Sequence, residues 1–194
     1  MNVETCFDLG SCVCHFERHI KRIFDCKVIC IDAYPPLEEL YLREKKNYQM
    51  ALLHSVDNLE VKYYVNDFLF GGNSMFREIN HDVFPNENYI RLKTITLDTL
   101  VEKHDLPYPD FIKIDCQGSE YHILKGASKV LDRCKYLIVE LQETQYNERA
   151  VLAPTVITYL KSSGWLLLAE KFSQNPADAD YFFVNLRNTD LRSF

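Results

Sequence analysis

The feature that most constrains the fold of this chain is the regular alternation of short apolar segments with amphipathic ones. Apolar segments run from Val3 to Leu9, from Val28 to Asp32, from Phe111 to Asp115 and from Tyr136 to Leu141, and helical patterns follow them. Such alternation predicts an α/β fold, in which helices cover both faces of a mostly parallel sheet. The carboxyl ends of parallel strands share one edge of the sheet, and ligands bind at that edge.

The other segments extend this pattern. We expect helices over residues 13–25, 35–48, 97–104, 120–131 and 154–163, and strands over residues 50–55, 61–65 and 90–96. Pro35 and Pro36 suit the first turn of the second helix, and Ser119 can cap the fourth. Residues 165–170 and 181–186 are expected to form a terminal hairpin. We predict one domain over residues 1–194, excised from a longer protein or minimal for its group.

The composition narrows the class of protein. The net charge of −6 argues against nucleic acid as the main partner, because phosphate binding leaves a basic footprint. The seven cysteines include no CxxC pair, so we expect reduced, mostly buried thiols rather than a zinc site. No apolar stretch reaches the roughly 18 residues of a membrane span, and the start resembles no signal peptide. We therefore expect a cytoplasmic protein.

The loop Asp8-Leu9-Gly10-Ser11-Cys12 follows a strand and precedes a helix. A glycine there lets the backbone approach a ligand closely, and the N–H groups at the start of the helix suit a carboxylate or phosphate. Asp8 can accept from an ammonium group. Dinucleotide binding is a rival interpretation, but it favours three glycines where this loop has one. A plain turn between strand and helix is another.

Asp32 ends the second strand, 24 residues after Asp8. A carboxylate at this position can hold both ribose hydroxyls of a nucleotide cofactor. Tyr34 is placed to pack near an adenine. The alternative for Asp32 is capping of the helix that follows.

Two further acidic residues end predicted strands at the same edge. Asp115 lies in the segment from Lys113 to Glu120, and Glu140 ends the strand from Tyr136. On neighbouring strands, the two carboxylates would form a general base with its orienting partner, or two ligands of a divalent cation such as Mg²⁺ or Mn²⁺. Helix capping with surface charge is the alternative for the segment around Asp115.

These motifs resemble the FkbM family of methyltransferases. The resemblance is strongest in IRLKTITLDTL, DFIKIDCQGSEYHILKGASKVL and YLIVELQ, whose order and spacing match the family between Ile90 and Leu141. It extends more weakly to VETCFDLGSCVCHF, to VICIDAYPP, to Asn73-Ser74 and to DYFFVNL, so nearly the whole chain is covered.

The resemblance implies a Rossmann-like class I methyltransferase fold, with a mostly parallel seven-stranded sheet and a C-terminal antiparallel hairpin. It implies transfer of a methyl group from S-adenosylmethionine to a hydroxyl of a sugar or glycan, or of another small molecule. The acceptor would be supplied by glycosyltransferase domains, fused or separate. The cofactor would contact Asp8, Gly10, Ser11, Cys12, Asp32 and Tyr34. Asp115 would be the base, or a metal ligand, with Glu140 as its partner. The acceptor would contact Asn73, Ser74, Lys113, Gln142 and Tyr146.

The chain also departs from the family pattern. Cys14 stands where the first loop usually has a later glycine, and Gln117 replaces a frequent glutamate. A left-handed backbone costs a non-glycine residue about 1–2 kcal/mol, so we expect Cys14 to be helical. These departures leave open a degenerate, non-catalytic module that binds a glycan or a partner protein.

Overall fold

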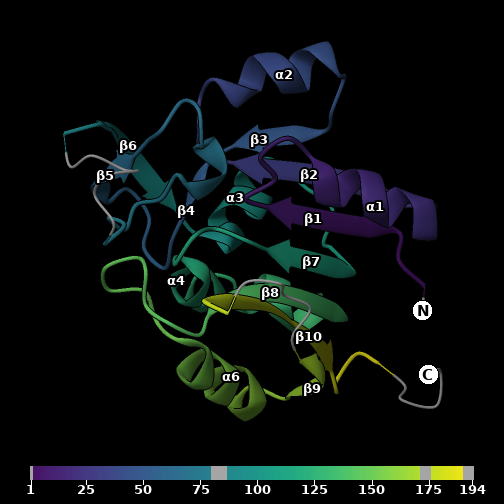
Figure 1. Ribbon diagram of the computed structural model, residues 1–194. Coiled ribbons are helices and arrows are strands. Elements are labelled where there is room, and N and C mark those ends of the chain that lie inside the picture. The colour runs from purple at the N-terminus through teal and green to yellow at the C-terminus, as the bar shows by residue number, and fades with distance from the viewer. Residues whose placement is uncertain (1, 80–86, 171–175, 190–194) are drawn as a thin grey trace.

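The structure, a computed structural model, describes residues 2–79, 87–170 and 176–189. Figure 1 shows a central twisted sheet with helices on both sides. The strands are β1 (Thr5–Leu9), β2 (Lys27–Asp32), β3 (Tyr48–Met50), β4 (Leu52–Leu53), β5 (Glu60–Tyr64), β6 (Tyr89–Ile95), β7 (Phe111–Ile114), β8 (Tyr136–Gln142), β9 (Trp165–Glu170) and β10 (Asp178–Asn185). The helices are α1 (His15–Ile23), α2 (Leu37–Arg43), α3 (Leu97–Lys103), α4 (Glu120–Lys125), α5 (Ser128–Arg133) and α6 (Ala153–Ser162), with a 3-10 turn, η1, at Phe70–Gly72.

The main sheet has seven strands in the order β3-β2-β1-β7-β8-β10-β9. The first five of these strands are parallel to one another, and β10 pairs antiparallel with both β8 and β9. This confirms the predicted Rossmann-like fold, including the antiparallel hairpin. A second sheet, in the order β4-β6-β5, lies beside the carboxyl ends of β1 and β2 (Figure 1).

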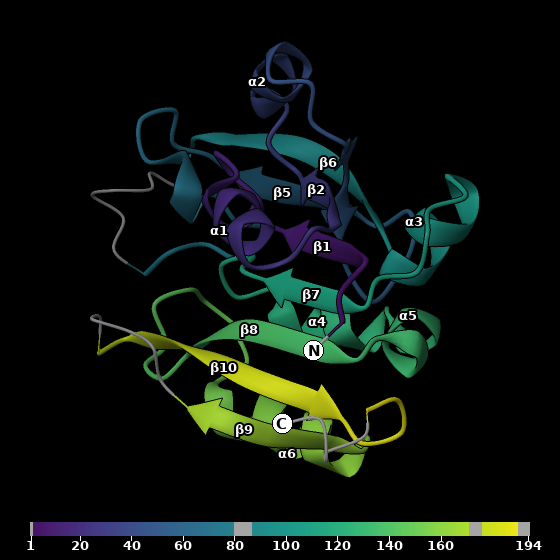
Figure 2. The same cartoon turned by 90° about the vertical axis from the view of Figure 1, so that its right-hand side faces the viewer.

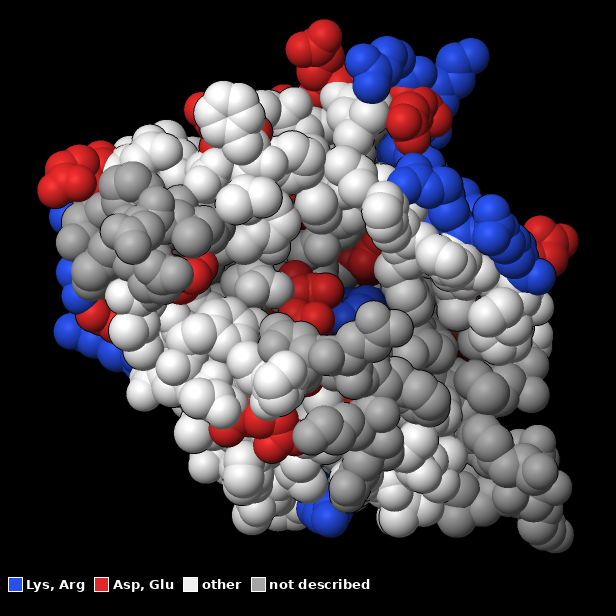
Figure 3. Space-filling view, in the orientation of Figure 1, with Lys and Arg blue, Asp and Glu red and all other residues white. Residues whose placement is uncertain are grey.

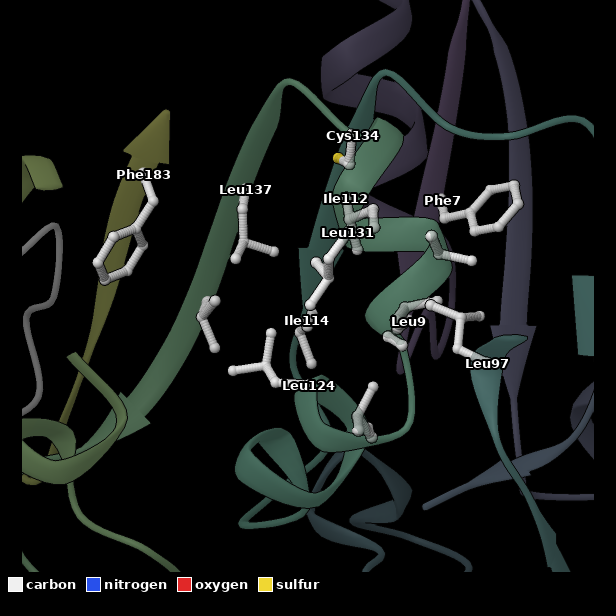
Figure 4. Packing of buried hydrophobic residues seen from close by; sticks show 14 of the residues in the cluster. Phe7, Leu9, Leu97, Ile112, Ile114, Leu124, Leu131, Cys134, Leu137 and Phe183 are labelled. Carbon is white, nitrogen blue, oxygen red and sulfur yellow. The ribbon is translucent and has the colours of Figure 1, made fainter. Parts of the chain in front are cut away.

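The two faces of the main sheet carry separate apolar cores, because side chains alternate between the faces along each strand. Phe7, Leu9, Ile112 and Ile114 pack against α3, α4, α5 and α6. Figure 4 shows several of these side chains meeting Leu124 and Leu131 of the helices. On the other face, Cys6, Val28 and Cys30 of β1 and β2 pack against α1 and α2, and Figure 2 shows α1 across β1 from α3. Each fully buried side chain of this kind contributes roughly 1.5–3 kcal/mol.

The expected strand over residues 50–55 is wrong as a single element. β3 pairs with β2, whereas β4 pairs with β6 in the second sheet. The chain changes sheets at Ala51, whose N–H donates to the carbonyl of Asp32. This change of sheet brings the backbone after β3 across the carboxyl end of β2.

Two expected helices are shorter than the sequence indicated. The second ends at Arg43, because Lys45 takes a left-handed conformation at φ 54°. The fourth divides into α4 and α5 at Gly126, where a Cβ atom would lie 2.3 Å from the carbonyl oxygen of His54. None of the helices within the described ranges combines the length and apolar character needed to cross a membrane.

Candidate active site

One row of residues crosses the carboxyl edge of the main sheet. Since Leu9 is paired with Ile31 and with Ile114, the next residues in register are Asp32, Gly10 and Asp115. The pairing of Ile114 with Val139, and of Glu140 with Asp180, extends the row. The register therefore collects four carboxyl groups from four strands, and the sequence predicted three of them, Asp32, Asp115 and Glu140.

Gly10 is where the loop after β1 meets the loop after β7. Its φ is +77°, and a Cβ atom there would lie 1.7 Å from the carbonyl oxygen of Asp115. The Gly10 N–H donates to the carbonyl of Ile31, and the Asp115 N–H donates to the carbonyl of Leu9, both at 2.9 Å. Only glycine fits, because both the conformation and the space exclude a side chain.

The prediction that Cys14 is helical is wrong. Cys14 precedes α1 in a left-handed conformation, with φ 58° and ψ 39°, and Cys12 is left-handed too, at φ 47°. The loop is held by hydrogen bonds from the Cys14 N–H to the carbonyl of Ser11 and from the Cys12 N–H to Asp32 Oδ2. Such surrounding contacts allow a strained backbone to persist, at about 1–2 kcal/mol for each non-glycine residue.

Asp32 holds this loop against the end of β2. Its Oδ2 accepts from the Cys12 N–H at 2.8 Å, and its Oδ1 accepts from the Tyr34 N–H at 2.9 Å. Burial raises the pKa of the Asp32 carboxyl, and these N–H groups oppose that effect. Each oxygen keeps acceptor capacity, since an ionised carboxylate has about four lone-pair sites.

The structure turns two of the predicted cofactor residues away from the cleft described below. Ser11 Oγ lies 3.0 Å from the hydroxyl of Tyr41, which donates to the carbonyl of Cys12. Tyr34 stacks on Phe70 with ring centroids 6.1 Å apart, and its hydroxyl donates to Asp67. Ser11 and Tyr34 therefore support the walls of the cleft from behind.

Asp8 lies one layer deeper, under the start of α1. It is 2% exposed, and it accepts a hydrogen bond from the N–H of Glu17 in the first turn of the helix. Its Oδ2 has no hydrogen-bond partner among the residues that the structure describes. Burial raises the pKa of Asp8 to about 7, although the nearby ammonium of Lys113 opposes the rise.

A central cleft opens between the loop after β1, the end of β2 and the loop after β7. Its lining consists of Gly10, Cys12, Ile31, Asp32, Ala33, Ala51, Leu52, Leu53, Tyr63, Phe70, Gly71, Asn73, Asp115, Cys116, Gln117, Ser119 and Ile123. Its volume is about 50 Å³. Typical small-molecule sites exceed roughly 300 Å³, so a nucleotide-sized ligand requires part of this wall to move.

Asn73 and Ser74 close the cleft from the side of the second sheet. Asn73 Oδ1 accepts from the N–H of Asn66 at 2.7 Å, while Asn73 Nδ2 is buried without a partner in the described part of the chain. An amide donor in this position suits an acceptor atom of a ligand in the cleft. Ser74 Oγ donates to the carbonyl of Gln117 at 2.7 Å, so it joins the second sheet to the loop after β7.

Asp115 and Glu140 share the side-chain amide of Gln117. Its Nε2 donates to Asp115 Oδ1 at 2.9 Å and to Glu140 Oε2 at 3.0 Å. Lys113 Nζ donates to Asp180 Oδ1 at 2.7 Å and lies 3.5 Å from Asp115 Oδ2. Figure 3 shows acidic and basic side chains together in a hollow near the centre of this face, whereas its other basic side chains lie at the rim.

The two carboxyl groups differ in proton affinity. Burial acts to raise the pKa of Asp115, but Lys113 and the hydrogen bonds of its neighbours outweigh burial and hold that pKa below its usual value. Burial and the charge of Asp115 raise the pKa of Glu140 to about 9. At neutral pH the pair therefore holds one proton on Glu140 and one negative charge on Asp115. Neighbouring carboxyl groups whose pKa values are shifted in opposite directions are typical of acid–base sites.

Tyr146 reaches the side-chain amide of Gln117 that the pair shares, and Gln142 supports Tyr146. The hydroxyl of Tyr146 lies 3.5 Å from Gln117 Oε1 and 3.4 Å from Asp178 Oδ2. Gln142 is buried, and its side chain bonds to Asn147 and to the N–H of Tyr146. Gln142 thus positions the loop that carries Tyr146 rather than lining the cleft.

The turn after Asp115 is built by Glu120, whose role the sequence did not reveal. Its Oε1 accepts from the N–H of Cys116 at 2.8 Å and of Gly118 at 3.1 Å, and burial raises its pKa to about 7. The expected cap by Ser119 is wrong, since its side chain makes no capping hydrogen bond within the described residues. A glutamate one residue further on can reach back over the tight turn, which Ser119 cannot.

Two more acidic residues of the site, Asp178 and Asp180, were missed because β10 was expected to begin at Tyr181. The signal is the alternation in Asp178-Ala179-Asp180-Tyr181-Phe182, which places both carboxylates on one face of a strand.

The neighbours of Asp115 and Glu140 suit a carboxyl pair that handles a proton better than one that holds a cation. Lys113 and the Gln117 amide already face the two carboxyl groups, and a divalent cation requires oxygen ligands instead. In the described part of the chain, one set of three side chains brings metal-binding atoms within 4.8 Å of one another. That set is Cys14, Glu17 and Cys30, and Glu17 is bonded there to Lys21 and Lys46.

The parallel sheet, the glycine loop after β1 and the acidic row define the class: this is a Rossmann-like methyltransferase fold. The sequence matches the Methyltransferase FkbM domain over residues 10–167, and the chain belongs to this family. It is also similar to the hexuronic acid methyltransferase AglP of Haloferax volcanii, with 38% identity over 55 residues. That match covers 28% of this chain and 23% of the relative.

Proposed function

We propose that this protein transfers a methyl group from S-adenosylmethionine to a hydroxyl group of a sugar or glycan. The observation that carries the proposal is the Asp115–Glu140 pair, in which Asp115 lines the central cleft and is ionised beside Lys113. The family supports methyl transfer, and the name of the relative supports a sugar acceptor.

The cleft residues suit the proposed cofactor. Asp32 offers free lone pairs for ribose hydroxyls, and Asn73 Nδ2 offers a donor that has no partner among the described residues. Leu53 and Ile123 offer apolar surface for a base. S-adenosylmethionine supplies a methyl group already activated on a sulfonium. The protein must therefore orient the acceptor hydroxyl and take up its proton.

Asp115 is our candidate for the base. Its ionised carboxylate would accept the hydrogen bond of the acceptor hydroxyl and would take up the proton as the hydroxyl oxygen bonds to the methyl carbon and the carbon–sulfur bond of the sulfonium breaks. Glu140 and Gln117 hold Asp115 in place, and Lys113 keeps it ionised. Orientation contributes roughly 7–11 kcal/mol in such reactions, and a positioned base adds roughly 10²–10⁴-fold.

Calorimetric titration with S-adenosylmethionine, S-adenosylhomocysteine and NAD tests the cofactor. We expect the first two to bind and NAD not to bind. NAD binding alone would replace the proposal with a nicotinamide enzyme, and no binding by any of the three would favour the non-catalytic module.

The Asp115→Ala variant tests the base. It should bind S-adenosylhomocysteine as the wild type does but lose turnover at least about 100-fold on sugar acceptors. Asp25→Ala, an exposed change between α1 and β2, is the matched control. Full activity of Asp115→Ala would discard the assignment.

We also propose that the protein is cytoplasmic. Its acceptor glycan would be assembled by glycosyltransferase domains, either fused to this chain or separate.

A further inference from the structure

A second pocket, here called the basic pocket, lies between β5, the segment after Ser74 and the start of α4. Its volume is about 580 Å³, which is in the range of sites for small molecules. Three of its lining residues are Lys62, Arg77 and Arg149, whereas the chain as a whole has a net charge of −6. Local positive charge against an acidic background indicates a site for an anion.

The cationic side chains of the basic pocket are not all neutralised by acids. Arg77 is paired with Glu148, the one acidic residue among the described residues that line the pocket. Lys62 Nζ lies over the ring of Tyr89, 4.2 Å from its centroid, and it forms no ion pair with a carboxylate of the described residues. Arg149 lines the same pocket from the loop after Tyr146.

Aromatic rings form one wall of the basic pocket. His54 and His122 stack with ring centroids 4.6 Å apart at an angle of 12°, and Phe76 lies 5.5 Å from His122. Burial lowers the pKa of both histidines, so each ring is neutral at pH 7 and carries one N–H donor. Flat rings beside charged donors suit a sugar ring that bears an anionic group.

Buried side chains lie between the basic pocket and the Asp115–Glu140 pair and link their walls. Ser74 Oγ donates to the carbonyl of Gln117 and accepts from the N–H of Phe76, so one hydroxyl joins the two sites. Asn147 bonds to the carbonyl of Phe76, and it lies between Tyr146 at the acid pair and Arg149 in the pocket. Because Ser74 and Asn147 are buried, protein fills the space between the two sites, and the basic pocket is a separate site.

The charges of the two sites favour the basic pocket as the site for an anion. A carboxylate near Asp115, Glu140 and Asp180 would meet like charges, whereas the same group in the basic pocket would meet Lys62 and Arg149. We propose that the basic pocket binds the carboxylate-bearing sugar of an acidic glycan. This inference rests on the proposed function for the acceptor, but the binding of the acidic sugar is measurable without turnover.

The test is a titration of the wild-type protein by NMR, following the imidazole signals of His54 and His122. The probes are methyl β-glucuronide, the neutral methyl β-glucoside and inorganic phosphate. We expect the glucuronide to shift both signals and to raise both histidine pKa values, and the glucoside to do so at least about tenfold more weakly, as loss of a charge-assisted hydrogen bond requires. Equal responses to both sugars would overturn the proposal, and so would a response to phosphate alone.

Matched variants distinguish binding in the basic pocket from non-specific attraction to positive surface charge. Arg149→Met and Lys62→Met should each weaken glucuronide binding about tenfold. Arg149→Lys, which keeps the positive charge, should retain most of the wild-type affinity. Lys161→Met, an exposed change on α6, should have no effect. Unchanged binding in both pocket variants would overturn the proposal. If S-adenosylhomocysteine fails to bind while the glucuronide response persists, the proposed function fails and the anion site stands.

Discussion

Replacing Asp8 with asparagine should stabilise this protein at neutral pH. The folded structure raises the pKa of Asp8 from 3.8 to about 7, because the carboxyl group is buried and one oxygen has no partner among the described residues. At about 1.36 kcal/mol per pKa unit, this shift corresponds to about 4 kcal/mol. Asparagine keeps an acceptor for the N–H of Glu17 and carries no charge.

The pH dependence follows from the sign of the shift. Because the folded state binds this proton more tightly than the unfolded state, the wild type loses stability as the pH rises from about 4 to about 7. The Asp8→Asn variant has no proton to release at this position, so its stability does not fall in this way. The two proteins should therefore unfold alike below about pH 4, and the variant should be more stable by up to about 4 kcal/mol above pH 7.

Urea unfolding at a series of pH values measures this difference. The fluorescence of Trp165, the one tryptophan of the chain and 4% exposed, reports the transition. Asp25→Asn is the matched control, since Asp25 is exposed and its change should give a flat difference across the pH range. An Asp8→Asn variant that is less stable at pH 8, or equally stable at every pH, would refute the reasoning.

Three further predictions concern the loops of the site. Gly10→Ala should lower the free energy of unfolding by more than the roughly 1–2 kcal/mol of its left-handed backbone, measured by urea unfolding, since its Cβ would lie 1.7 Å from the Asp115 carbonyl; a smaller loss would contradict the close approach. Gln117→Glu should place a third carboxylate against Asp115 and Glu140 and reduce turnover more at pH 8 than at pH 6, as a pH–rate profile would show; a parallel profile would count against it. Binding of S-adenosylhomocysteine should change amide hydrogen exchange in residues 66–72, because the cleft holds about 50 Å³; unchanged exchange there would mean that another wall opens.

The sequence predicted the parts of the site that follow from long apolar runs. Asp115 and Glu140 each follow a buried strand, so their place at one edge depends only on strand direction and on which strands are neighbours. The place of Gly10 at this edge could be predicted for the same reason, because it follows the first strand. That the Asp115 backbone is its closest neighbour could not be predicted.

The parts that the sequence did not predict depend on contacts between distant segments. The left-handed conformation of Cys14 opposes its local preference and is held by the Ser11 carbonyl, within a loop that Asp32 fixes from another strand. The break at Gly126 reflects the approach of the His54 carbonyl, which no local pattern signals. Tertiary contacts of this kind override propensities of about 1 kcal/mol.

The position of β10 has a consequence for the order in which the molecule is completed. β10 is inserted between β8 and β9, although it follows both in the chain, so β9 has no partner in the main sheet until β10 arrives. Asp180, the partner of Lys113, arrives on the same strand. During synthesis on the ribosome, a chain that has emerged only as far as β9 therefore has its glycine loop and its carboxyl pair but leaves the Lys113 ammonium without that counter-ion. The acidic row is complete only after the last of the described strands has been made.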